Sequence, residues 1–341
     1  MINSAPKRQA GLSLVELMIA ITLSLLLIAG VLQIFLSSKQ TYSTNNALSR
    51  IQESGRFAVD FLSQDIRNTG YKGQCLDEPV IHGNIGSKAS SGSSEALMSL
   101  ETPIYGWDNI ESATSLPQSP SITPVTGTDA ILIKLAAGPK EIDAANTNTA
   151  SNETISLGSN TSGVAQHAIT LISDAISCEL FENTASTNAT SIARASGSPW
   201  EHAYTGAIEV LPLQNATYYI RANANDRPNS LVRQRLSSNS TQPIWITEEL
   251  VDGVRDMQIR YGIATGADRQ VARYETADEV TNDNNWDNVV AVRIDLLVES
   301  ADTNVVPENQ VITFNSTNVT IENRRLAQVF STTIGIRNRL P

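Results

Sequence analysis

The chain has 341 residues, 41% hydrophobic and 17% charged, a composition typical of a globular protein with one large domain or two moderate ones. It carries 24 Lys and Arg against 35 Asp and Glu, a formal net charge of −11. So acidic a body should not bind nucleic acid by simple electrostatics, because a phosphate backbone would repel it.

The most informative segment is an apolar run over residues 12–36 that contains a single carboxylate, Glu16. The run is longer than the roughly 20 residues needed to span a bilayer, and a charge at that depth is costly and therefore marks function. The only basic residues before it are Lys7 and Arg8, so we expect residues 1–11 in the cytoplasm and the bulk of the chain outside.

The start of this run resembles the processing site of type IV prepilins. Residues 11–20 read GLSLVELMIA, with a short basic leader before Gly11. The resemblance implies that a prepilin peptidase removes residues 1–11, cutting between Gly11 and Leu12, and methylates the new amine of Leu12. Glu16 would then be the fifth residue of the mature chain, placed to pair with an N-terminal amine during assembly. The alternative is an uncleaved signal anchor with an incidental glutamate.

The helix should continue past the membrane, since no proline occurs between Pro6 and Pro79. At 100° per residue the apolar side chains of residues 37–70 fall on one face and the charged ones on the rest, and Gly70 is a plausible stop. The predicted helix, residues 12–69, is about 85–90 Å long. The residues expected on its packing face are Leu48, Ile51, Ala58, Val59, Leu62 and Ile66.

The remainder reads as a β-rich body. Residues 71–205 are rich in Ser, Thr, Asn and Gly, with apolar islands at 130–135 and 168–172, and we expect a loop-rich, variable β region there. Residues 206–341 have denser strand signals, at 207–211, 217–221, 231–236, 244–247, 257–261, 289–298 and 326–336. The predicted fold class is α+β, with a long N-terminal helix whose first half spans the membrane and whose second half packs on antiparallel sheet.

Two cysteines occur, Cys75 and Cys178, both on the side predicted to lie outside the cytoplasmic membrane. An even pair in an oxidising compartment is most simply a disulfide, and the alternative is two separate buried thiols. Neither cysteine has a C-x-x-C partner, which argues against a redox centre or a zinc knuckle.

Little else in the sequence suggests chemistry. Asp283, Asn285 and Asp287 have the alternating oxygens of a calcium loop, but residue 288 is not glycine and residue 294 is not glutamate, so a hydrophilic turn is the better interpretation. The three histidines are scattered, and no hydrolase, zinc-protease or nucleotide-binding motif is present. We therefore expect neither an enzyme nor a cofactor.

Three further segments resemble PilW-type minor pilins: residues 30–71, residues 250–262 and residues 325–339. The resemblance implies a structural subunit of the type IV pilus that primes or joins assembly near the tip. It would be held in the inner membrane with its globular domain in the periplasm, and would then move to the pilus. The implied partners are the prepilin peptidase, the major pilin, other minor pilins and a large tip adhesin. Two alternatives stay open, a large pseudopilin of a type II secretion system and a membrane-anchored binding module or adhesin that never polymerises.

Overall fold

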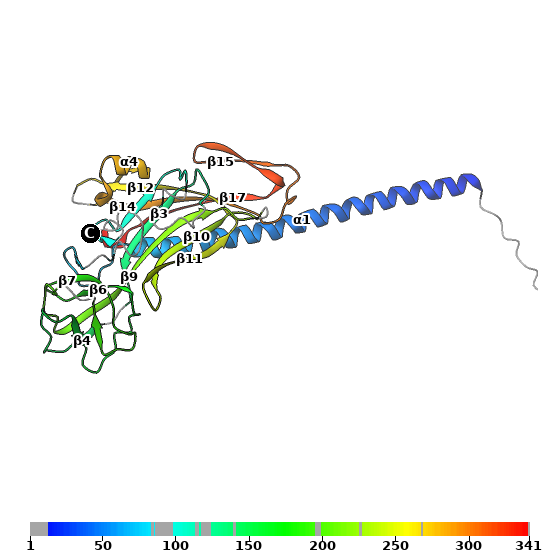
Figure 1. The fold of residues 1–341 in the computed structure, drawn as a ribbon. Helices are drawn as coiled ribbons and strands as arrows, with labels where there is room; N and C mark the ends of the chain where they lie inside the picture. The colour runs from blue at the N-terminus through cyan, green and yellow to red at the C-terminus, as the bar shows by residue number, and fades with distance from the viewer. Residues whose placement is uncertain are drawn as a thin grey trace, which may run out of the picture.

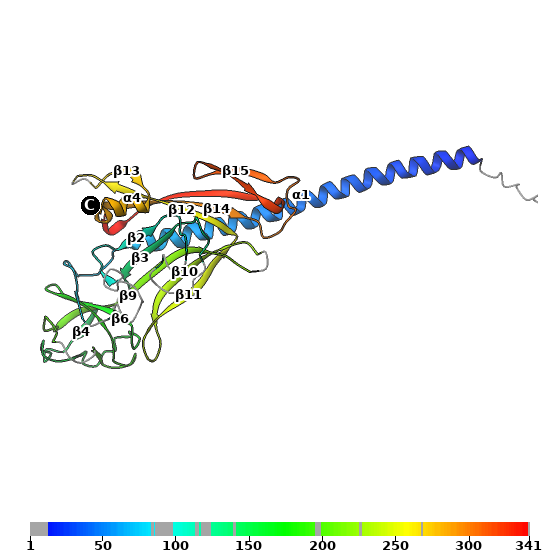
Figure 2. The same cartoon turned by 45° about the horizontal axis from the view of Figure 1, so that its top comes forward.

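The computed structural model describes residues 13–82, 85, 98–112, 116, 124–138, 141–194, 199–224, 227–266 and 269–339. It consists of one long helix, α1 (Leu14–Asn68), and a β-rich body (Figures 1 and 2). The N-terminal half of α1 projects from the body alone, whereas its C-terminal half lies against the sheets (Figure 1). The predicted α+β class is confirmed.

The buried face of α1 recurs every three or four residues, as an amphipathic helix requires. One predicted member of this face is wrong: Leu48 is 36% exposed, because the face begins one residue earlier. The helix ends as expected, with Thr69 as its C-cap and Gly70 in the left-handed region at φ +79°, which favours glycine. The buried residues are Ala47, Ile51, Gly55, Ala58, Leu62 and Ile66.

The larger sheet has nine strands and is built around β9 (Gly206–Arg221). Its main order is β1 (Val80–Ile81), β7 (Cys178–Glu182), β6 (Ile169–Ser173), β9, β10 (Ser230–Ser238) and β11 (Pro243–Asp252). β3 (Ala130–Ala136) and β4 (Glu141–Ala144) also pair with β9, and β2 (Ile104–Trp107) pairs with β3. Pairing is antiparallel except between β1 and β7.

The smaller sheet has the order β13 (Val271–Glu275), β12 (Val254–Ala264), β14 (Val289–Glu299) and β17 (Ala327–Gly335). Two separate pairs are β15 (Gln310–Phe314) with β16 (Thr317–Ile321), and β5 (Thr154–Ser156) with β8 (Ser191–Ala193). The short helix α4 (Ala277–Asn282) precedes the 3₁₀ turn η2 (Trp286–Asn288); η3 (Glu322–Arg324) and η4 (Arg337–Arg339) flank β17.

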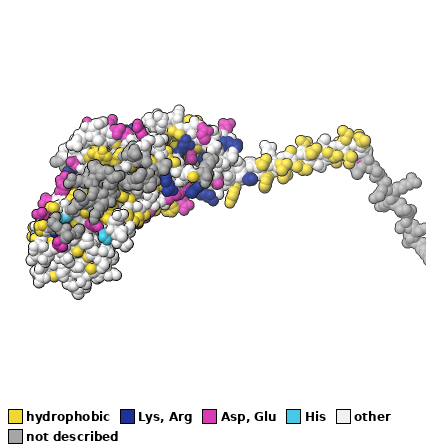
Figure 3. All heavy atoms as spheres, in the orientation of Figure 1, with side chains coloured by type: hydrophobic (Ala, Val, Ile, Leu, Met, Phe, Trp, Pro, Cys, Tyr) yellow, Lys and Arg dark blue, Asp and Glu magenta, His cyan; other side chains and the backbone are white. Residues whose placement is uncertain are grey.

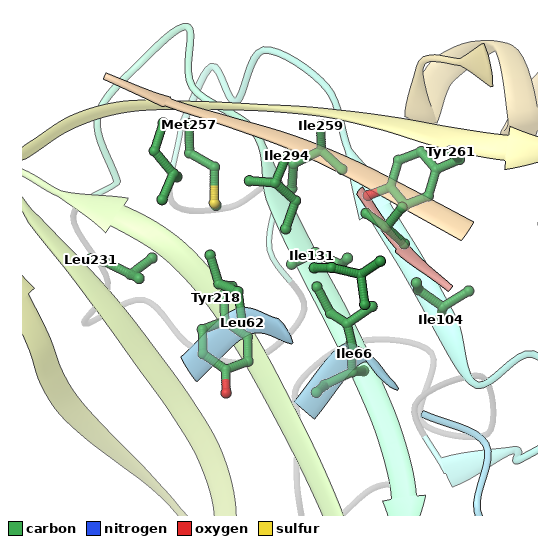
Figure 4. Close-up of a cluster of buried hydrophobic side chains, with 14 of the residues drawn as sticks. Leu62, Ile66, Ile104, Ile131, Tyr218, Leu231, Met257, Ile259, Tyr261 and Ile294 are labelled. Carbon is green, nitrogen blue, oxygen red and sulfur yellow. The ribbon is translucent and has the colours of Figure 1, made fainter. Parts of the chain in front are cut away.

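The main core lies where α1 meets the two sheets. In Figure 4, Leu62 and Ile66 of α1 share one cluster with Tyr218 of the larger sheet and Met257 and Ile294 of the smaller one. Helix α1 lies against β17 and β11, which are terminal strands of the two sheets. It also contacts the inner strand β14, so the helix packs against both sheets.

A second core lies in what we call the distal lobe, formed by β4–β8 and the first half of β9. It surrounds Trp200, which makes edge-to-face contacts with Phe181 and Tyr204. The lobe lies at the end of the body away from the projecting half of α1 (Figure 1). Between the lobe and the main core is a third cluster that includes both cysteines.

Candidate functional site

The first candidate site is the N-terminus of α1, where Ser13 and Glu16 form a capping box. The Glu16 backbone N–H donates to Ser13 Oγ at 3.2 Å, and the Ser13 backbone N–H donates to Glu16 Oε2 at 3.3 Å. Each side chain thus satisfies a backbone donor that the helix leaves unpaired. The lone carboxylate of the apolar run therefore stabilises the first turn of its own helix.

The predicted cleavage residues Gly11 and Leu12 lie outside the described residues, as does the leader, residues 1–11. Leu12 directly precedes Ser13, whose N–H already meets the Glu16 carboxylate. In the sequence, the nitrogen that cleavage would free belongs to the residue before Ser13. The role of Ser13 was missed by the sequence analysis, although Ser-x-x-Glu before an apolar run is a readable capping signal.

The apolar side chains of the projecting half of α1 are exposed to solvent. Its large apolar side chains from Leu14 to Leu36 are all more than half exposed, and Glu16 is the one charged residue among them. In Figure 3, hydrophobic side chains interspersed with white atoms cover most of the projecting helix. Within the described part of the chain, α1 is the one helix long and apolar enough to cross a membrane.

Polar contacts from α1 to the larger sheet fix the helix against the body. Tyr218 donates its hydroxyl hydrogen to Asp65, and Arg233 Nη1 donates to the same carboxylate at 3.3 Å. Arg233 also donates to Glu248 on β11 at 2.8 Å. Burial, and then the Asp65 charge, raise the pKa of Tyr218 well above its usual value, so it stays a hydrogen-bond donor.

A second attachment lies near the midpoint of α1. The Val305 carbonyl accepts hydrogen bonds from Gln40 Nε2 and from Thr44 Oγ1, the latter at 2.8 Å. Val305 is buried and its own N–H donates to the Arg324 carbonyl at 2.9 Å. We call this contact the stem clasp. It joins the body to α1 near the middle of the helix, and polar residues such as Gln40 and Thr44 give no sequence signal for it.

The predicted Cys75–Cys178 disulfide is confirmed, and the alternative of two separate thiols is wrong. The two Cα atoms lie 5.5 Å apart and the bond closes a sequence separation of 103 residues. It joins the segment that follows α1 to the start of β7 in the distal lobe.

The calcium candidates Asp283, Asn285 and Asp287 have separate contacts within the protein. Asp283 ends α4, the Asn285 side chain accepts from Asn288 at 2.6 Å, and Asp287 lies 3.8 Å from Arg339. Over the described ranges, no group of three or more His, Cys, Asp or Glu side chains could hold a metal ion. The hydrophilic turn stays the preferred interpretation, and the calcium alternative stays untested.

The histidines are less scattered in space than in sequence. His82, His167 and His202 each meet a carboxylate of the β6–β7 hairpin or its turn. The partners are Glu179, Glu182 at 2.7 Å and Asp174 at 2.8 Å, respectively. All three are therefore ion-pair or hydrogen-bond partners that hold the distal lobe.

Two known families match parts of the chain. Residues 6–32 match the prokaryotic N-terminal methylation motif, and residues 217–338 match the type IV pilus-assembly protein W family, PilW. The two matches support a type IV pilin of the PilW type. The second match spans the predicted segment 250–262 and all but the last residue of the predicted segment 325–339. The two matches leave residues 33–216 uncovered, and with them most of the predicted segment 30–71.

No curated protein and no solved structure matches the chain. The geometry at the start of α1 agrees with the methylation motif, which implies prepilin peptidase processing and assembly partners. A PilW-type pilin is a minor pilin related to the type IV pilus, and its bare apolar helix suits membrane anchoring.

Proposed function

We propose that this minor pilin is a non-catalytic subunit that is stored in the cytoplasmic membrane and then enters a type IV pilus. Residues 12–36 would anchor it with the body in the periplasm, and prepilin peptidase would release residues 1–11. Near the tip it would prime or join assembly with other minor pilins, the major pilin and a large tip adhesin. The PilW match and the methylation motif support this proposal.

The observation that carries the proposal is the carboxylate of Glu16 at the start of a bare apolar helix. In a filament core the helix surface is dry, and a buried charge needs a partner. The amine of Leu12, from the same or a neighbouring subunit, can supply it. Two unit charges about 4 Å apart attract by roughly 4 kcal/mol at an effective dielectric of 20, before desolvation is subtracted. The pair would contribute more to the register of the helix in the filament than to the stability of the filament.

Two alternatives also use the apolar run of α1. A pseudopilin of a type II secretion system would share the leader and Glu16, and the PilW match over residues 217–338 favours the pilus instead. A membrane-anchored binding module or adhesin that never polymerises would need the apolar run but not the carboxylate.

The test compares Glu16→Ala with a matched control, Glu53→Ala, which removes an exposed carboxylate from the same helix. The Glu16 variant should still insert into the membrane, because its apolar run becomes more apolar. N-terminal mass analysis should show that it is still cut between Gly11 and Leu12. It should be lost from sheared pili, whereas the control should be retained. Normal incorporation of Glu16→Ala would refute charge pairing, and a mature N-terminus elsewhere would refute the processing site.

A further inference from the structure

Two apolar side chains at the distal end of the body are exposed to solvent. Leu76 is 84% exposed and Ile176 is 77% exposed, more than any other large apolar side chain described outside α1. With Val80, itself 41% exposed, they border one shallow groove of about 240 Å³ beside the disulfide. Isolated exposed apolar residues are ordinary, but neighbouring ones around a groove mark interaction surfaces.

Both loops that carry these side chains are fixed. Asp174 Oδ1 accepts from the backbone N–H groups of Ile176 and Ser177, each at 2.8 Å. On the other loop, Lys72 Nζ donates to the carbonyls of Leu76 at 3.0 Å and of Asp77 at 2.8 Å.

The Cys75–Cys178 disulfide then joins the two loops. A partner would therefore meet loops whose backbone is already held in place, which lowers the entropy cost of binding. We call Leu76, Val80 and Ile176 the distal apolar patch.

Carboxylates border this patch. Asp77 and Glu78 directly follow Leu76 and are exposed. Glu78 also faces a second carboxyl group, that of Glu101, and this contact raises the pKa of Glu101. Like charges placed this close repel, so a Lys or Arg side chain of a partner would reduce the electrostatic repulsion between these carboxyl groups.

We propose that the distal apolar patch and its acidic border are the docking surface for another subunit of the pilus. The partner surface would be apolar and bordered by Lys or Arg. Naming the partner as a pilus subunit rests on the proposed function. A second copy of this chain fits less well, since its net charge of −11 would repel an acidic border. The patch is near β7, at the end away from the projecting half of α1, where a partner can reach it outside the membrane (Figure 1).

Photo-crosslinking in the native bacterium tests the contact. A photoreactive phenylalanine analogue is placed in the full chain at Leu76, at Ile176 or at Val311, a control that is 63% exposed on β15. Positions 76 and 176 should give a product with a different pilus protein, through a peptide that contains Lys or Arg, and position 311 should not give that product. A product with a second copy, a product with a protein outside the pilus, or no product at 76 and 176 would overturn the proposal.

Incorporation into sheared pili gives the second readout. The double variant Leu76→Asp, Ile176→Asp and the charge reversal Asp77→Lys, Glu78→Lys should each lower incorporation about tenfold, as loss of a binding hot spot does. Val311→Asp should not lower it. All these side chains are exposed, and an intact disulfide on unreduced gels verifies folding. Absence of the unaltered chain from pili would refute the proposed function, whereas normal incorporation of both variants would refute the docking surface alone.

Discussion

Gly55 shows how closely α1 approaches the smaller sheet. A Cβ atom at this position would overlap the ring of Phe330 on β17, whereas a Cβ at Gly30 would meet no atom within 4 Å. We expect Gly55→Ala to lower the free energy of unfolding by about 1–3 kcal/mol through overpacking. Gly30→Ala is the control and should not destabilise the protein.

Thermal unfolding of the full chain in detergent measures both variants. Adding Phe330→Leu to Gly55→Ala should restore part of the loss, because the smaller side chain makes room for the methyl group. Equal stability of Gly55→Ala and the unaltered protein would contradict the close packing of Gly55 against Phe330.

Asp129 is a buried carboxyl group, 2% exposed, between the two sheets. Its oxygens accept from the backbone N–H groups of Asn109 at 2.9 Å and of Ile259 at 2.7 Å. Burial raises the pKa of Asp129 from 3.8 to about 8, against the lowering effect of the two backbone donors, and neighbouring Asp108 adds to the rise.

The raised pKa predicts the sign of a pH effect. Between pH 4 and pH 8 the folded state holds a proton on Asp129 that the unfolded state releases, so this group's contribution to stability falls as pH rises. The unfolding temperature should fall from pH 5 to pH 8, and the fall should be smaller in Asp129→Asn. The variant should also be less stable at pH 5, because one amide oxygen replaces two acceptors. Equal slopes in the two proteins would contradict the assignment.

At the scale of elements, the stem clasp can be tested with neighbouring threonines. Thr44 Oγ1 donates to Val305, whereas Thr41 Oγ1 donates to Ser37 within the helix, so Thr41→Val is a matched control for Thr44→Val. Loss of the clasp bond should cost about 0.5–1.5 kcal/mol. Hydrogen exchange at the Asn304, Val305 and Val306 amides should speed up in Thr44→Val and not in the control. Unchanged exchange would mean that Gln40 alone holds the loop.

The strands also show how far the sequence predicts the fold. Long apolar or alternating segments were correctly predicted as β3, β6, β10, β11, β12, β14 and β17, because burial dominates their residue choice. Strands β4, β5, β7 and β8 of the distal lobe and the β15–β16 hairpin were missed, since strands of three to five residues are too short to show a clear period.

One predicted break is wrong. Residues 207–211 and 217–221 were expected as two strands, but β9 runs through both. Pro212 lies near the change of partners, from β4 and β6 on one part of the strand to β3 and β10 on the other. A proline at such a change is tolerated although it reads as a strand breaker.

At the scale of the molecule, the candidate functional sites also divide into those that local sequence predicts and those that it does not. The processing motif and Glu16 are local in sequence and could be predicted, and the cysteine pair followed from the compartment. The stem clasp and the distal apolar patch bring together residues roughly 100 to 260 positions apart, and only the folded chain shows them.

The disulfide joins the distal lobe to the segment that follows α1. Its loss should therefore destabilise the lobe more than the main core. Cys75→Ser with Cys178→Ser should cost about 2–5 kcal/mol. Hydrogen exchange should rise first in β6 and β7 of the lobe and little in β14 of the main core, which serves as the internal control. A uniform rise across both sheets would show that the lobe and the body unfold as one unit.

Strand β9 has a mechanical consequence. It is one uninterrupted backbone of 16 residues that begins in the distal lobe and ends in the main core, where Tyr218 holds Asp65 of α1. Tension applied to the lobe and resisted at the helix runs along this backbone, and the antiparallel hydrogen bonds to its neighbours lie across the direction of pull. Such bonds are loaded together in shear instead of one after another, so a pull on the outer end of the subunit is carried to its helix without opening the sheet.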